Sequence, residues 1–221
     1  MPTSNRKVYD EELLQLDSML ARMGHAAGGA IESAMTALKN GDLELARSVV
    51  ARDSEINAVE HDVEHRCLTL ILRQQPVASD LRKISAALKM ITDMERIGDQ
   101  ALDIAEIVET GKILEVKDTD LLGRMAEVTM DMVSKSVEAY VSQDLQRAQS
   151  VIDSDDLVDD LFMEIRMTLI NSIENQDMDE EQILDYLMIA KYYERIGDHA
   201  TNIAEWVEFS ILGKHRSGKE V

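Results

Sequence analysis

The sequence predicts an all-α protein made of two repeated three-helix bundles, six long helices in all, related by a pseudo-twofold axis. Its composition favours long helices with a core, because 221 residues include only 2 Pro and 10 Gly while 45% are hydrophobic. Apolar residues recur at three- and four-residue spacing, and strand-like alternation is not sustained anywhere in the sequence. A stretch near residue 100 also recurs near residue 200, which predicts the repeat.

The first half of the sequence is expected to contain three helices after a flexible lead-in at residues 1–9. Gly41 is suited to a left-handed helix cap, and Asp42 to the N-cap of the helix that follows. Pro76 cannot continue a helix and therefore marks an end. The three expected helices span residues 10–39, 43–75 and 79–111.

The second half repeats this order of helices. Asp42 aligns with Asp144 by a shift of 102 residues, whereas the repeated ERIGD aligns by a shift of 99. The turns between the second and third helices can accommodate this difference of three residues. The three helices are expected at residues 121–142, 145–173 and 179–212. The expected organisation is a first repeat at 10–112, a linker at 113–120, a second repeat at 121–212 and a flexible tail at 213–221.

The repeated stretch is the third helix of each half. Residues 91–109 read ITDMERIGDQALDIAEIVE, and residues 190–208 read AKYYERIGDHATNIAEWVE. Each copy has an apolar arc that predicts a core face. A glycine inside a helix costs about 1 kcal/mol relative to alanine, so we expect another helix to approach closely at Gly98 and Gly197. The arcs are Met94, Ile97, Gly98, Ala101, Ile104, Ala105 and Val108, and Tyr193, Ile196, Gly197, Ala200, Ile203, Ala204 and Val207.

Beside the apolar arc, each copy carries a stripe of acidic side chains within one narrow arc of the helix. Acids at this spacing repel one another by about 0.2–0.5 kcal/mol per pair in an isolated helix. The stripes therefore favour nearby cations, which lysine, arginine or a metal ion could supply. The first stripe is Glu95, Asp99, Asp103 and Glu106, and the second is Glu194, Asp198, Asn202 and Glu205.

Charge and composition restrict the function classes. A formal net charge of −20 disfavours binding of nucleic acid or anionic lipid by the surface as a whole. The single Cys67 cannot form an intramolecular disulfide, and the sequence shows no signal peptide or apolar run of membrane-spanning length. We therefore expect a cytoplasmic protein.

Catalysis is not expected from the motifs. The sequence contains no phosphate-binding loop and no nucleophile-base pattern. One alternative is a metal-binding helical bundle of the carboxylate-bridged type with catalytic activity. That class requires paired Glu-x-x-His motifs, and the nearest match is Asp62 with His65. A plain helical scaffold is a further alternative, but it leaves the repeated acidic stripe unexplained.

The order QQPVASDLR at residues 74–82, then ERIGD, then ERIGDHATNIAEWV near the C-terminus resembles the PhoU family of bacterial phosphate-transport regulators. The resemblance covers nearly the whole chain. It implies a cytoplasmic, non-enzymatic adaptor, often a homodimer, that represses the phosphate-starvation response when phosphate is plentiful. The implied partners are the ATPase subunit of the phosphate ABC transporter and the PAS region of a membrane sensor histidine kinase. Nucleic acid is not an implied partner, and the membrane is reached only through these proteins.

The resemblance also implies a metal site, because some members of the family bind multinuclear metal clusters through E/D-x-x-x-D motifs. These motifs map onto Glu95, Asp99 and Asp103 and onto Glu194, Asp198 and Asn202. Asn202 is a neutral and weaker ligand than an acid. Oxygen ligands suit hard ions, and Fe, Zn, Mn or Mg is expected. Further acids could come from the second helix of each bundle: Asp53, Glu60, Glu64, Asp155, Asp156, Asp159 and Asp160.

Ion pairing is the alternative explanation of the stripes, with partners among Arg82, Arg96, Arg166, Lys191 and Arg195. His199 lies about 100° from the acidic arc and is expected at an interface or in solvent. His61 and His65 are expected on a solvated face. The 13 Met residues are expected mostly in the core, with an exposed subset that could serve a partner. Trp206 either stacks at an interface or covers the end of the bundle.

Overall fold

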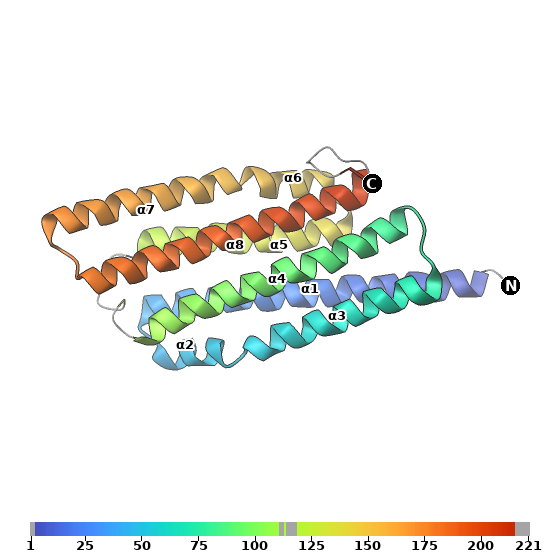
Figure 1. Cartoon of the computed structure of the whole chain (residues 1–221), viewed down its shortest axis with the longest axis horizontal. Helices are drawn as coiled ribbons and strands as arrows, with labels where there is room; N and C mark the ends of the chain where they lie inside the picture. Colours follow the sequence, from blue (N-terminus) through green and yellow to red (C-terminus); the bar gives the residue numbers. More distant parts are fainter. Residues whose placement is uncertain (1–2, 111–112, 114–118, 215–221) are drawn as a thin grey trace.

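A computed structural model describes residues 3–110, 113 and 119–214, and these residues form eight α-helices. Helices α1–α4 belong to the first half and α5–α8 to the second (Figure 1). This confirms the predicted all-α architecture of two repeated three-helix bundles. The helices are α1 (Thr3–Asn40), α2 (Leu43–Val50), α3 (Asp53–Gln74), α4 (Ser79–Thr110), α5 (Asp120–Ser142), α6 (Leu145–Asp153), α7 (Asp155–Asn175) and α8 (Glu180–Leu212).

Two of the six expected helices are each divided in two, which corrects the prediction of unbroken helices. The helix expected at residues 43–75 breaks at Arg52, which separates α2 from α3. The helix expected at residues 145–173 breaks at the equivalent Ser154, which separates α6 from α7. Asp and Ser residues adjoin both breaks. Their short polar side chains compete for backbone hydrogen bonds and favour caps over helix interiors.

The ends of the chain differ in part from the expected lead-in and tail. Helix α1 begins at Thr3 rather than near residue 10, and Tyr9 is buried in the core, which anchors this first part of the helix. Helix α8 ends before Gly213, whose φ of 71° gives the left-handed cap. The tail beyond Lys214 and most of the expected linker at 113–120 lie outside the described residues.

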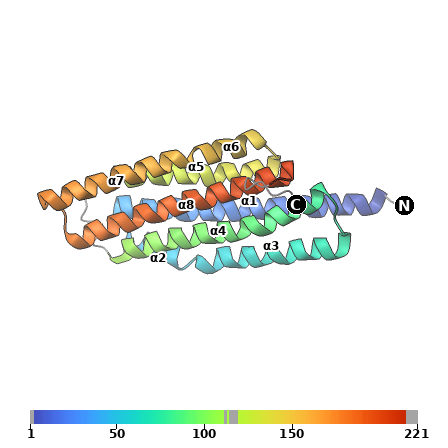
Figure 2. The same cartoon turned by 45° about the horizontal axis from the view of Figure 1, so that its top comes forward.

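The four longest elements form the centre of the molecule. Helices α4 and α8 pack on each other, as do α1 and α5, so the two halves share one core. In each half, the broken pair of helices covers the outside, with α2 and α3 against α1 and α4, and with α6 and α7 against α5 and α8 (Figures 1 and 2). Helices α4 and α8 run antiparallel, which places the two repeated stretches face to face.

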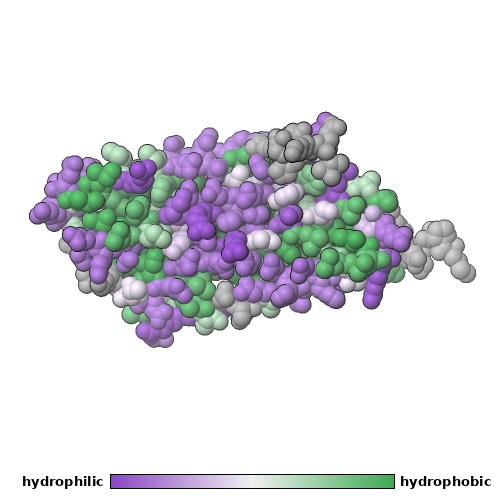
Figure 3. Space-filling view, viewed as in Figure 1, coloured by the Kyte–Doolittle hydropathy of each residue, from purple (hydrophilic) through white to green (hydrophobic). Residues whose placement is uncertain are grey.

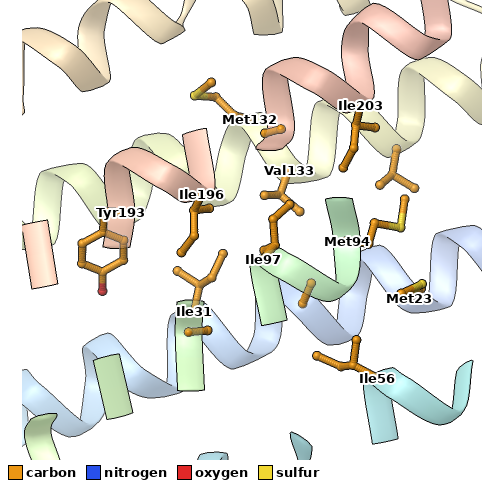
Figure 4. Close-up of a cluster of buried hydrophobic side chains, with 14 of the residues drawn as sticks. Met23, Ile31, Ile56, Met94, Ile97, Met132, Val133, Tyr193, Ile196 and Ile203 are labelled. Atoms are coloured by element: carbon orange, nitrogen blue, oxygen red, sulfur yellow. The ribbon is translucent and has the colours of Figure 1, made fainter. Parts of the chain in front are cut away.

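Both predicted apolar arcs are buried in the core. Figure 4 shows Ile97 of α4 and Ile196 of α8 converging near Ile31 of α1. A Cβ atom added at Gly98 would lie 2.8 Å from Ile56 Cδ1, which confirms the expected close approach in the first half. A Cβ atom at Gly197 would lie 3.4 Å from Val158 Cγ1, an ordinary contact. An alanine at position 98 would therefore require the end of the Ile56 side chain to shift, whereas one at position 197 would not displace a neighbour.

The predicted N-cap at the start of the outer helices is confirmed in the first half and repeated in the second. The Asp42 carboxylate accepts a hydrogen bond from the Leu45 backbone N–H at 2.9 Å. The Asp144 carboxylate accepts one from the Arg147 backbone N–H at 3.0 Å. Each cap satisfies a helix-terminal N–H that has no partner inside the helix.

Candidate acidic site

The two acidic stripes lie on α4 and α8, one of the two pairs of helices that join the halves. In the first stripe, Arg96 engages its own neighbours on α4. Its Nη1 donates to Asp99 Oδ2 at 3.2 Å, and its Nε lies 3.4 Å from Glu95 Oε2. These side chains are partly exposed, and such pairs contribute about 0–1 kcal/mol. The first stripe is thus partly compensated by an ion pair within one helix.

Asp103, the third member of the first stripe, lies near α8. Burial raises the pKa of its carboxyl, as do the charges of Glu106 and Asp99, whereas Arg195 of α8 lowers it. Burial and Asp103 also raise the pKa of the Tyr192 phenol, another group on α8. Asp103 is therefore placed at the seam between the halves, with an arginine of the opposite half nearby.

Glu194 and Asp198 of the second stripe lie near α7. Lys191 pairs with Glu194 through a contact of 2.5 Å, and the Lys191 ammonium lies 5.6 Å from the centre of the Phe162 ring on α7. These two contacts place Lys191 between α7 and α8. Lys191 is thus a cation beside Glu194, as Arg96 is beside Glu95 and Asp99 in the first stripe.

Asp198 lies among other acids. Burial raises the pKa of its carboxyl, and the charges of Glu194 and of Asp155 on α7 raise it further. The pKa of Asp155 is likewise raised, by burial and then by Asp159, although Thr201 donates a hydrogen bond to it at 3.3 Å. We call this set the α7–α8 carboxylate cluster: Asp155, Asp159, Glu194 and Asp198.

The structure brings only some of the additional acids to a stripe. Asp155 and Asp159 join the second stripe, and Asp156 adds its charge beside Asp155. Glu64 lies 3.8 Å from His61 on an exposed face. The side chain of Asp53 lies outside the described part of the chain.

A polar contact between α4 and α8 was not expected from the sequence. Asp93 Oδ1 accepts a hydrogen bond from the Asn202 amide at 3.1 Å and lies 2.9 Å from His199 Nδ1. Asn202 is thereby directed to the other half. His199 lies at the interface between the repeats, which is one of the two places expected for it. One feature of the sequence could have indicated this contact: Asn202 and His199 differ from their equivalents in the first repeat, Asp103 and Gln100.

The donor atoms of the α7–α8 carboxylate cluster suit a hard cation, since they are all carboxylate oxygens. Among the described residues, however, no three side chains of His, Cys, Asp or Glu are already placed to hold one metal ion. Binding would require carboxylates of the cluster to turn toward a common point. The metal assignment of the two stripes stays a prediction.

Several other side chains singled out in the sequence lie outside the acidic stripes. His61 and His65 are exposed, as expected for a solvated face. Cys67 is buried, and burial raises the pKa of its thiol to about 12. Trp206 is partly buried with its ring edge-on to Phe209 at 5.8 Å, so it covers part of the core. Within the described ranges, none of the helices has the length and apolar character required to span a membrane.

The chain is similar to known proteins along nearly its full length. The family model of the PhoU domain matches twice, at residues 20–108 and 122–207, once in each half. The chain is 35% identical over 213 residues to the "Phosphate-specific transport system accessory protein PhoU homolog" of Clostridium acetobutylicum, across 95% of this chain and 96% of that one. It is 34% identical to the homolog of the same name from Zymomonas mobilis, across 94% and 88% of the two chains.

Solved structures share the fold as well. The crystal structure of PhoU from Pseudomonas aeruginosa superimposes with a TM-score of 0.85 at 30% identity, over 93% of this chain and 100% of that one. The crystal structure of the phosphate transport system regulatory protein PhoU from Streptococcus pneumoniae gives 0.87 at 25% identity, over 94% and 98%. The names of the curated relatives describe an accessory protein rather than an enzyme.

Proposed function

This chain belongs to the PhoU family, and from that premise we propose that it is a regulatory accessory protein of phosphate-specific transport. The observation that carries the proposal is the match of both halves to the family model, together with a likeness to PhoU crystal structures along nearly the full chain. The expectation that the chain is not an enzyme agrees with the names of its relatives.

The finer proposal is an adaptor that acts through protein contacts in the cytoplasm. It would hold the phosphate-starvation response off while phosphate is plentiful, by linking the transporter's ATPase subunit to the PAS region of a sensor histidine kinase. Its support is the family membership and a helical fold with two acidic stripes on its central helices. A homodimer is part of the same proposal and can be tested by mass measurement in solution.

We further propose that the α7–α8 carboxylate cluster binds a hard divalent or trivalent cation. Burial raises the pKa of Asp198 and Asp155, and neighbouring acids raise it further. A cation would relieve the repulsion among these carboxylates. When bound, the ion would supply positive charge to this part of the surface. The first stripe has Arg96 and Arg195 nearby, so we expect weaker metal binding there.

The adaptor proposal is tested by binding of the purified chain to the transporter's ATPase subunit and to the kinase's PAS region. We expect the wild-type chain to bind and a stripe variant to bind at least about tenfold more weakly, a change of about 1.4 kcal/mol. The stripe variant carries Glu95→Ala, Asp99→Ala, Glu194→Ala and Asp198→Ala. A matched control removes four exposed acids elsewhere: Glu11→Ala, Asp62→Ala, Glu127→Ala and Asp131→Ala.

Two outcomes count against this proposal. If the wild-type chain binds neither partner, the adaptor role is wrong. If the stripe variant and the control lose affinity equally, overall charge is responsible and the stripes are not the contact surface.

The metal proposal is tested separately, by elemental analysis of untagged protein purified without chelator. We expect stoichiometric Fe, Zn, Mn or Mg in the wild-type chain and its loss in a variant with Asp155→Asn and Asp198→Asn. Absence of metal from both proteins would make these acids an ion-pair network or a protein contact. The adaptor proposal would then stand without a metal.

A further inference from the structure

An exposed apolar surface covers the outer side of α7 and the beginning of α8. Its members are 41% to 61% exposed, although large apolar side chains favour burial. Figure 3 shows hydrophobic residues gathered at the left end of the molecule, over α7 and α8, with hydrophilic residues around them. We call it the α7–α8 apolar patch, and it consists of Met163, Met167, Ile170, Ile173, Leu184 and Met188.

The residues of the patch on α7 form one continuous stripe. Met163, Met167, Ile170 and Ile173 follow one another at intervals of three or four residues, which places them along one side of the helix. At 1.5 Å per residue, the stripe is about 15 Å long, or nearly three helical turns. Helices α7 and α8 pack on each other, so Leu184 and Met188 extend the apolar surface sideways.

The segment that contains the patch is also the most acidic part of its repeat. Residues 155–188 include eleven Asp or Glu and a single Lys or Arg, which is Arg166. The equivalent segment of the first half, residues 53–89, includes six acids and five bases. The second segment therefore contributes −10 to the net charge, half of the total of −20, whereas the first contributes −1.

The fold itself does not require this apolar surface, and the repeat provides the comparison. The first half has the same helices, yet it places polar residues at most of the equivalent positions. The counterparts of Met163, Met167, Leu184 and Met188 are His61, His65, Ser85 and Lys89. Apolar exposure together with strong acidity is thus specific to the second half.

We propose that the α7–α8 apolar patch binds a basic amphipathic helix of a partner protein. A stripe of this length accommodates about three turns of a helix whose apolar side lies on it. The methionines adapt their unbranched side chains to the partner's surface. The surrounding acids attract Lys and Arg on the flanks of that helix and discriminate against acidic segments.

Charge distinguishes this occupant from others. A second copy docked through the same face would bring two acidic borders together, and like charges in apposition oppose association. Anionic lipid and nucleic acid are repelled for the same reason. The apolar patch shares no residue with the acidic stripes or the α7–α8 carboxylate cluster, so its binding of a basic helix can fail while the adaptor and metal proposals stand.

The test uses the full chain and a model peptide as the probe. The peptide has about 15 residues, Leu along one helical side and Lys on the other, and its binding is followed by fluorescence anisotropy. We expect a patch variant with Met163→Gln, Met167→Gln and Leu184→Gln to bind at least about tenfold more weakly than the wild-type chain. A control with Leu68→Gln, Leu72→Gln and Leu81→Gln changes exposed apolar residues of the first half and is expected to bind as the wild type does.

Several results would overturn the proposal. These are equal loss of affinity in the control, equal binding of a scrambled peptide without an apolar side, or tight binding of a Leu/Glu peptide. A patch variant that changes the mass of the protein in solution would identify the occupant as a second copy instead.

Methyl NMR of the wild-type chain provides a second measurement that needs no variant to fold. On addition of the peptide, the Met163, Met167 and Met188 methyl signals are expected to shift, while those of the buried Met23 and Met94 remain in place. Shifts confined to methionines outside the patch would contradict the assignment.

Discussion

At the scale of single residues, the surroundings of Asp198 and Asp155 disfavour the ionised form of their carboxyl groups. Burial and neighbouring acids raise the pKa of both, although Lys191 and Thr201 act in the other direction. Ionising these groups therefore costs the folded state free energy that the unfolded chain does not lose. A bound cation or a basic group of a partner would offset this cost.

Removing one of these charges is expected to stabilise the protein at neutral pH. A carboxyl with a raised pKa binds its proton more tightly in the folded state, so its contribution to stability falls as pH rises through its titration range. In protein freed of metal by a chelator, Asp198→Asn should increase the free energy of unfolding near pH 7, and the gain should vanish at acidic pH, where Asp198 is protonated. Urea unfolding across pH measures both. An equal gain at every pH would contradict this origin, and Asp131→Asn on α5 is the control.

The two equivalent glycines provide a matched pair. Replacing a helical glycine by alanine stabilises by up to about 1 kcal/mol where the new methyl group has space. At Gly197 the added Cβ atom meets only ordinary contacts, whereas at Gly98 it lies 2.8 Å from Ile56 Cδ1. We expect Gly197→Ala to raise the free energy of unfolding and Gly98→Ala to raise it less or lower it. Equal stabilisation by both would show that Ile56 moves aside freely.

The sequence located the acidic stripes because 100° per residue suffices to place side chains on one helix face. Periodicity within one helix could not reveal partners from another helix. Asn202 was grouped with Glu194 and Asp198 by its spacing, yet it donates to Asp93 across the seam between α4 and α8. The same limit applies to Asp155, whose place beside Asp198 depends on how α7 packs on α8.

At the scale of elements, the outer helices of each half begin at an aspartate cap and break after about two turns. The caps and the breaks occupy equivalent positions in the two repeats. Spacing of apolar residues predicted six helices, since apolar positions continue through each break. The breaks depend on Asp and Ser residues that satisfy the backbone locally, a signal present in the sequence but weaker than the periodicity.

Loss of a cap should be measurable in either repeat. Replacing an N-cap aspartate by alanine costs about 1 kcal/mol, because an N–H at the helix start loses its acceptor. We expect Asp42→Ala and Asp144→Ala each to lower the free energy of unfolding by about that amount. Asp42→Asn and Asp144→Asn keep an acceptor oxygen and should lower it less. If the Asn variants lose as much as the Ala variants, the hydrogen bonds to Leu45 and Arg147 are not the cause.

At the scale of the whole molecule, the two repeats have similar folds but different outer surfaces. The central contact between α4 and α8 is formed by the repeated stretches, and the apolar arcs that form it are nearly the same in both halves. The outer surfaces have diverged, since half of the net negative charge lies in residues 155–188. A shared core with unlike outer faces suits a protein that brings different partners together.

The most direct test of the regulatory role is a reporter of the phosphate-starvation response in cells. The gene for this chain would be deleted in the organism that encodes it, and the strain would be grown in phosphate-rich medium and complemented with the wild-type chain. We expect high reporter activity in the deletion strain and repression restored by the wild-type chain. Reporter activity that is already low without the chain, or stays high when the chain is present at normal levels, would contradict the account.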